Sequence, residues 1–130
     1  MASTVFTNAR LVLADRVCEG SLLVEGSRIA GIYPGEAGNG MRADQEVNAE
    51  GCFLAPGFID IHTHGGGGAD FMDGDLDSIY TASAMHLSHG TTSIVPTTVT
   101  STKQSLLDFV DLFNQVDLRR PVRRPPCGAR

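Results

Sequence analysis

The chain has 130 residues, of which 42% are hydrophobic and 19% charged, a composition that suits an ordinary soluble domain rather than a disordered segment. Its net charge of −5 gives no indication of general nucleic-acid binding. No apolar run reaches the ~18 to 20 residues of a membrane span, and no basic stretch followed by an apolar one marks a signal peptide.

The cysteines and the C-terminal arginines bear on location and partners. The three cysteines, Cys18, Cys52 and Cys127, are widely spaced, which favours reduced thiols and a cytoplasmic protein. Half of the basic residues lie in the last twelve positions, beside prolines: Arg119, Arg120, Arg123, Arg124 and Arg130. Such a run is typical of a solvated connector, although it is also the one feature that would suit RNA.

Residues 4–55 predict a small β unit. The segments "TVFTNARLVL" and "SLLVEG" are rich in β-branched and aliphatic residues. The letters "EGSR" predict a hairpin in which Gly26 takes a positive φ. Residues 45–57 predict a further strand pair that turns at Gly51.

The next predicted strand, "FIDIHTH" at residues 58–64, carries polar side chains at every second position. Side chains of a strand alternate between its faces, so Asp60, His62 and His64 are expected on one face. Buried polar groups are costly without partners, so the three side chains on this face are expected to have partners.

A helix, a strand and a second helix are predicted to follow, which gives a βαβα order with parallel strands. The first helix covers residues 75–90, capped by Asp73 or Asp75 and ended by Gly90. The strand begins at Thr91 and has Pro96 near its C-terminal end. The second helix covers residues 101–116, with Ser101 and Gln104 as a capping box. The predicted buried positions are Ile79, Ala82, and Met85 or His86 in the first helix, and Leu106, Leu107, Val110 and Phe113 in the second.

Two histidines on one strand face can bind one metal ion, because neutral imidazole is a common metal ligand. The four glycines at 65–68 would let the backbone approach that ion. The alternative is that His62 and His64 are hydrogen-bonded core residues and that the glycines form a flexible loop. His86 and His89, near the end of the first helix, are expected to be structural.

The segments "APGFIDIHTHGGGGADFMDG" and "HGTTSIVPTT" resemble the N-acetylglucosamine-6-phosphate deacetylase family of the amidohydrolase superfamily. The resemblance implies an α/β fold: a small β-sandwich unit at residues 1–55, then the first two βα units of a (β/α)₈ TIM barrel at 56–130. It implies that His62 and His64 bind one or two divalent ions, Zn²⁺ or Fe²⁺. Asp60 is expected to orient one of these histidines by a hydrogen bond to the ring nitrogen that does not bind metal, or to bond to backbone.

The implied reaction is hydrolysis of N-acetylglucosamine 6-phosphate to glucosamine 6-phosphate and acetate. The family's metal-binding glutamate, later histidines and catalytic aspartate are absent from these 130 residues, so an N-terminal fragment, inactive alone, is expected. The full-length enzyme is expected to be a homodimer that binds neither nucleic acid nor membrane. Two alternatives remain, another amidohydrolase such as a cyclic amidase, or a catalytically silent metal-binding fragment.

Overall fold

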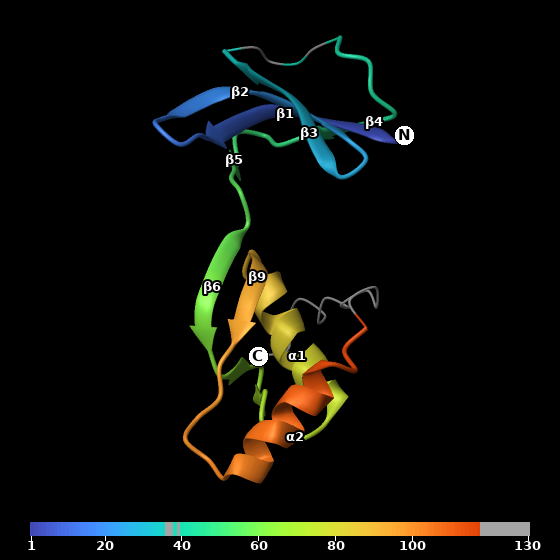
Figure 1. The fold of residues 1–130 in the computed structure, drawn as a ribbon. Coiled ribbons are helices and arrows are strands. Elements are labelled where there is room, and N and C mark those ends of the chain that lie inside the picture. The colour runs from blue at the N-terminus through green and yellow to red at the C-terminus, as the bar shows by residue number, and fades with distance from the viewer. Residues whose placement is uncertain (36–37, 39, 118–130) are drawn as a thin grey trace. The chain divides into compact units, whose positions relative to one another are not determined.

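The computed structural model describes residues 1–35, 38 and 40–117. Its contacts divide the chain into two units, one ending at Pro56 and one beginning at Gly57 (Figure 1). The boundary expected from the sequence lay between residues 55 and 56. The arginine run and Cys127 lie outside the described residues. Cys18 and Cys52 are free thiols.

The first unit is a single mixed β-sheet in the part of the chain that the structure describes. Its strands are β1 (Ser3–Val12), β2 (Val17–Glu25), β3 (Arg28–Pro34), β4 (Gln45–Asn48) and β5 (Phe53–Leu54). β2 is antiparallel to both β1 and β3, whereas β4 and β5 both run parallel to β1. The β-rich N-terminal unit predicted from the sequence is therefore present.

The predicted hairpin between β2 and β3 is confirmed, with Gly26 at φ 59°. A turn also exists at Gly51, at φ 79°, but the strand pair predicted around it is wrong. The backbone N–H groups of Ala49 and Gly51 donate to the carbonyl oxygens of Thr7 and Asn8, each at 2.8 Å. Because these bonds hold the turn against β1, the chain continues along β1 and β5 pairs there instead of folding back on β4.

The second unit has the predicted βαβα order (Figure 1). Its elements are β6 (Phe58–Thr63), β7 (Gly65–Gly66), β8 (Ala69–Asp70), α1 (Leu76–Ser88), β9 (Thr91–Pro96) and α2 (Lys103–Phe113). β6 and β9 are parallel neighbours, and Pro96 ends β9 as predicted. No helix among the described residues is long and apolar enough to cross a membrane.

The helix caps follow local hydrogen bonding. Asp75 caps α1, accepting from the backbone N–H of Ser78 at 2.8 Å. The cap predicted for α2 at Ser101 is wrong by one residue, since Thr102 caps this helix and accepts from the N–H of Ser105. With the cap moved, Gln104 does not occupy the capping-box position, and its amide donates to Asp108 at 2.8 Å.

The core of the second unit is small. Phe71, Ile79 and Ala82 are buried, and α2 packs against them through Phe109, Leu112 and Phe113. The stripe predicted for α2 is partly wrong, because Leu107 and Val110 are about half exposed. The contact line follows Phe109 and Leu112 at a spacing of three residues. Leu107 lies two positions before Phe109 and Val110 one position after it, so both side chains fall off this line.

Candidate functional site

β6 contains a bulge at the position of the first histidine. Asp60 pairs with Ile94 and Thr63 pairs with Pro96, so Ile61 and His62 together lie opposite Val95 alone. An extra residue of this kind breaks the alternation of side chains and re-aims one of them. Bulges are frequent next to active sites, where they serve this purpose.

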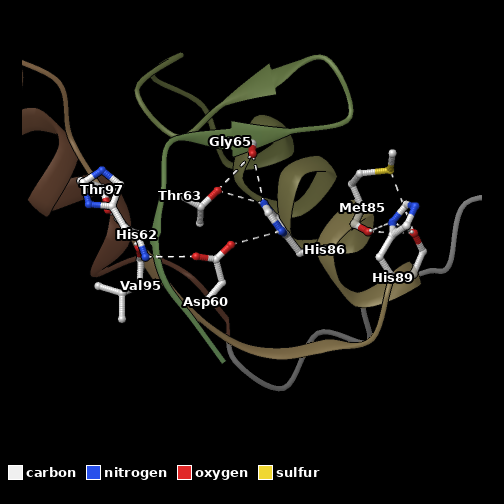
Figure 2. Close-up of polar contacts among 10 residues, drawn as sticks. Asp60, His62, Thr63, Gly65, Met85, His86, His89, Val95 and Thr97 are labelled. Atoms are coloured by element: carbon white, nitrogen blue, oxygen red, sulfur yellow. Dashed lines mark hydrogen bonds and ion pairs between the residues drawn. The ribbon is translucent and has the colours of Figure 1, made fainter. Parts of the chain in front are cut away.

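The expectation that Asp60 shares a face with His62 and His64 is therefore corrected. Asp60 and Thr63 both approach His86 of α1, although strict alternation would place them on opposite faces. Figure 2 shows the side chain of His62 on the other side of the strand, toward Val95 and Thr97. The bulge turns His62 away from Asp60.

His62 and His64 nevertheless converge. Their Nε2 atoms are 3.2 Å apart, and their ring centroids are 5.1 Å apart in an edge-on arrangement. His62 is exposed, whereas His64 is half-buried and its Nδ1 is buried with no hydrogen-bond partner among the described residues. The pair thus presents two ring nitrogens to one point at the end of β6.

This separation fits two ligands of one metal ion. Two imidazole nitrogens at tetrahedral positions about 2.0 to 2.1 Å from zinc would be about 3.3 Å apart. A direct hydrogen bond between neutral rings is also compatible with 3.2 Å. Within the described residues, no group of three or more ligating side chains surrounds a common point. The chain therefore contributes a pair of candidate ligands.

Asp60 lies beside the pair without touching either ring in the contacts that the structure shows. One carboxylate oxygen accepts from the backbone N–H of His62 at 3.0 Å. The other is 3.9 Å from Nδ1 of His86 (Figure 2). Asp60 thus acts on the backbone of the bulge, the second of the two roles expected for it, and an effect on a ligand's ring stays a prediction.

The four glycines form a hairpin packed on α1. Gly65–Gly66 pair with Ala69–Asp70, and the two turn residues, Gly67 and Gly68, have φ values of 64° and 84°. Such positive values suit glycine. A Cβ on Gly65 would collide with the carbonyl oxygen of Ala69. The segment is therefore an ordered hairpin rather than a flexible loop, and the approach of its backbone to an ion stays a prediction.

His86 and His89 are placed by different contacts. His89 Nδ1 lies 2.9 Å from the carbonyl oxygen of Met85, at the end of its own helix. His86 instead reaches across to β6 and β7, with Nε2 at 3.0 Å from Thr63 Oγ1 and 3.1 Å from the Gly65 carbonyl oxygen (Figure 2). Sequence reasoning assigned His86 a structural place but missed these partners, because nothing local to α1 signals them.

Comparisons with known proteins agree with the motifs. No protein-family model matches the chain. The N-acetylglucosamine-6-phosphate deacetylase of Bos taurus is 37% identical over 99 residues, which are 74% of this chain and 24% of that protein. A dihydroorotase of Wolbachia sp. subsp. Brugia malayi is 34% identical over 97 residues, 69% of this chain and 20% of that protein.

The fold agrees as well. The crystal structure of N-acetylglucosamine-6-phosphate deacetylase from Pasteurella multocida matches with a TM-score of 0.76 and 30% identity, covering 86% of this chain and 30% of that one. The chain spans about a quarter of the length of the curated deacetylases it matches. In sequence and in fold it is therefore similar to part of the N-acetylglucosamine-6-phosphate deacetylases, hydrolases of the amidohydrolase superfamily.

Proposed function

We propose that this chain supplies metal ligands to a hydrolase that converts N-acetylglucosamine 6-phosphate to glucosamine 6-phosphate and acetate. The observation that carries the proposal is the 3.2 Å separation of the Nε2 atoms of His62 and His64, at the end of β6. The C-terminal end of a barrel strand is where barrel enzymes place their active sites. The similarity to the deacetylases supports N-acetylglucosamine 6-phosphate as the substrate.

The residues present fit a divalent ion. To bind an ion through both Nε2 atoms, His62 and His64 would each carry the ring proton on Nδ1. A bound Zn²⁺ or Fe²⁺ supplies activation of a water molecule and of the acetamide carbonyl. The hairpin at Gly65 and the bulge at Ile61 hold the two imidazoles at the end of the strand.

Two imidazoles hold an ion weakly, since zinc sites typically use three or four ligands. We therefore expect the 130-residue chain to bind metal measurably but to release no acetate, because hydrolysis also needs a general base and further ligands. Acetate release above a metal-only blank would contradict this part of the proposal.

The test is to replace both histidines, His62→Asn with His64→Asn, and to measure zinc and iron per chain by elemental analysis of folded protein. We expect metal content to fall to the level of a chelated sample. A His89→Asn variant is the matched control, because His89 contacts only its own helix end in the contacts described, and it should keep its metal. Unchanged metal content in the double variant would refute the assignment.

A cyclic amidase is the second candidate, and the 34% identity to a dihydroorotase favours it. In an enzyme that carries this segment, acetate release from N-acetylglucosamine 6-phosphate would support the deacetylase, and ring opening of dihydroorotate the cyclic amidase. Activity toward neither would support a catalytically silent metal-binding protein. We further propose a cytoplasmic homodimer, which cell fractionation and sedimentation test.

A further inference from the structure

We propose that His86 is the positioning residue that sets the geometry of the His62–His64 pair. The inference rests on the proposed function and adds to it a residue from α1. His86 is mostly buried, with about a fifth of its side chain exposed. Its two ring nitrogens face three residues next to the pair: Asp60 and Gly65, which lie on either side of it in sequence, and Thr63, which lies between the two histidines.

The contacts on one side of the ring hold the end of β6. Nε2 lies 3.0 Å from Oγ1 of Thr63 and 3.1 Å from the carbonyl oxygen of Gly65. The Thr63 hydroxyl donates to the same carbonyl at 3.3 Å. Thr63 and Gly65 are the two neighbours of His64, so these bonds define where the backbone of His64 lies.

The other side of the ring lies near the bulge. Nδ1 of His86 faces the Asp60 carboxylate at 3.9 Å, and the second oxygen of that carboxylate accepts from the backbone N–H of His62. A neutral ring with its proton on Nε2 has no hydrogen on Nδ1, so this approach adds no hydrogen bond, and His86 acts on the pair through Thr63 and Gly65.

The tautomer follows from the partners. The carbonyl oxygen of Gly65 can only accept a hydrogen bond, so Nε2 of His86 carries a proton and donates it. Thr63 uses its own hydrogen toward Gly65 and its oxygen lone pair toward Nε2. A replacement must therefore place an N–H donor at the position of Nε2 in order to keep the clamp.

Two amide variants separate positioning from packing. His86→Gln has a side chain long enough to put its amide nitrogen where Nε2 lies, whereas His86→Asn is one methylene too short. Both keep a polar amide in the same half-buried site. Gln is also larger and a better helix former than Asn, so His86→Leu, which fills space in a helix without an N–H donor, is the packing control: if His86 only filled space or supported the helix, His86→Leu would bind zinc as well as His86→Gln.

The first experiment measures Zn²⁺ affinity of the full 130-residue chain by competition with a chromophoric chelator. The binding that disappears in the His62→Asn, His64→Asn double variant is the contribution of the pair. Removing a group that hydrogen-bonds a metal ligand typically weakens metal binding 10- to 100-fold, and His86, which acts through the two neighbours of His64, is expected at the lower end of this range. We expect a loss of about tenfold or more in His86→Asn and recovery in His86→Gln. Equal affinity in wild type and His86→Asn would overturn the proposal.

The second experiment needs no metal. The rings of His62 and His64 are close enough, at 5.1 Å between centroids, for a nuclear Overhauser effect between their carbon-bound protons in the metal-free chain. We expect this signal in wild type and His86→Gln and its loss in His86→Asn. Persistence in His86→Asn would refute positioning by His86. Absence of pair-dependent Zn²⁺ binding in wild type, with the signal behaving as expected, would instead refute the proposed function alone.

Discussion

Phe71 links the core of the second unit to the candidate site, and its removal provides a quantitative test of the fold. The side chain is fully buried and meets Phe113 edge-on at 5.9 Å between centroids. Its backbone N–H donates to the carbonyl oxygen of His64 at 2.9 Å. Truncation of such a residue, Phe71→Ala, costs about 3 to 5 kcal/mol through lost burial and the cavity that remains.

That loss is large for a unit of this size, because domains are stabilised by only about 0.05 to 0.15 kcal/mol per residue. Each 1.4 kcal/mol changes an opening equilibrium about tenfold. Amide hydrogen exchange in α1 and β9 should therefore accelerate about a hundredfold or more, to the point where protection is lost. The amides of β1 belong to the other unit and serve as an internal reference.

Phe58→Ala is the matched control, since it makes the same change in the same unit at a side chain that is 66% exposed. Only about a third of the burial is lost there, which corresponds to about 1 kcal/mol or less. If Phe71→Ala and Phe58→Ala accelerated exchange equally, the assignment of the core to Phe71, Ile79 and Ala82 would be wrong.

Two further predictions concern the segment between the histidines and α1. The hydrogen bond from the backbone N–H of Ser78, then that from its hydroxyl, lowers the pKa of Asp75 in the folded chain. Its capping contribution is therefore complete above the unfolded pKa, near 4, and lost as pH falls through the lower folded value, whereas an Asp75→Asn chain should show no such loss in α1 exchange. Gly65→Ala should open the β7–β8 hairpin, because the new Cβ meets the Ala69 carbonyl oxygen; native-like exchange at Phe71 would contradict this.

Much of the fold was predictable because its signals are local. Alternating apolar residues, the "EGSR" turn and the cap at Asp75 each act within a few positions along the chain, and the structure confirms them. The partner of β5 was not predictable in this way. It depends on hydrogen bonds from the turn at Gly51 to Asn8, more than forty residues earlier.

The candidate site was also predictable only where its signals are local. The spacing of His62 and His64 indicates that they meet, and the structure brings their rings together. The face of Asp60 was wrong, because a one-residue bulge leaves no mark in the pattern of residue types that defines a strand. The contacts of His86 were missed for a related reason, since they join α1 to residues more than twenty positions away.

Two short strands, β4 and β5, pair with the same side of β1, and this arrangement has a consequence for contacts between molecules. A long, straight strand at the margin of a sheet offers free N–H and C=O groups to a strand from another chain. Here that margin is built from β4, of four residues, and β5, of two, with the turn at Gly51 between them. An incoming strand would find its register interrupted after a few hydrogen bonds, so this margin of the sheet is protected against growing by addition of a second molecule.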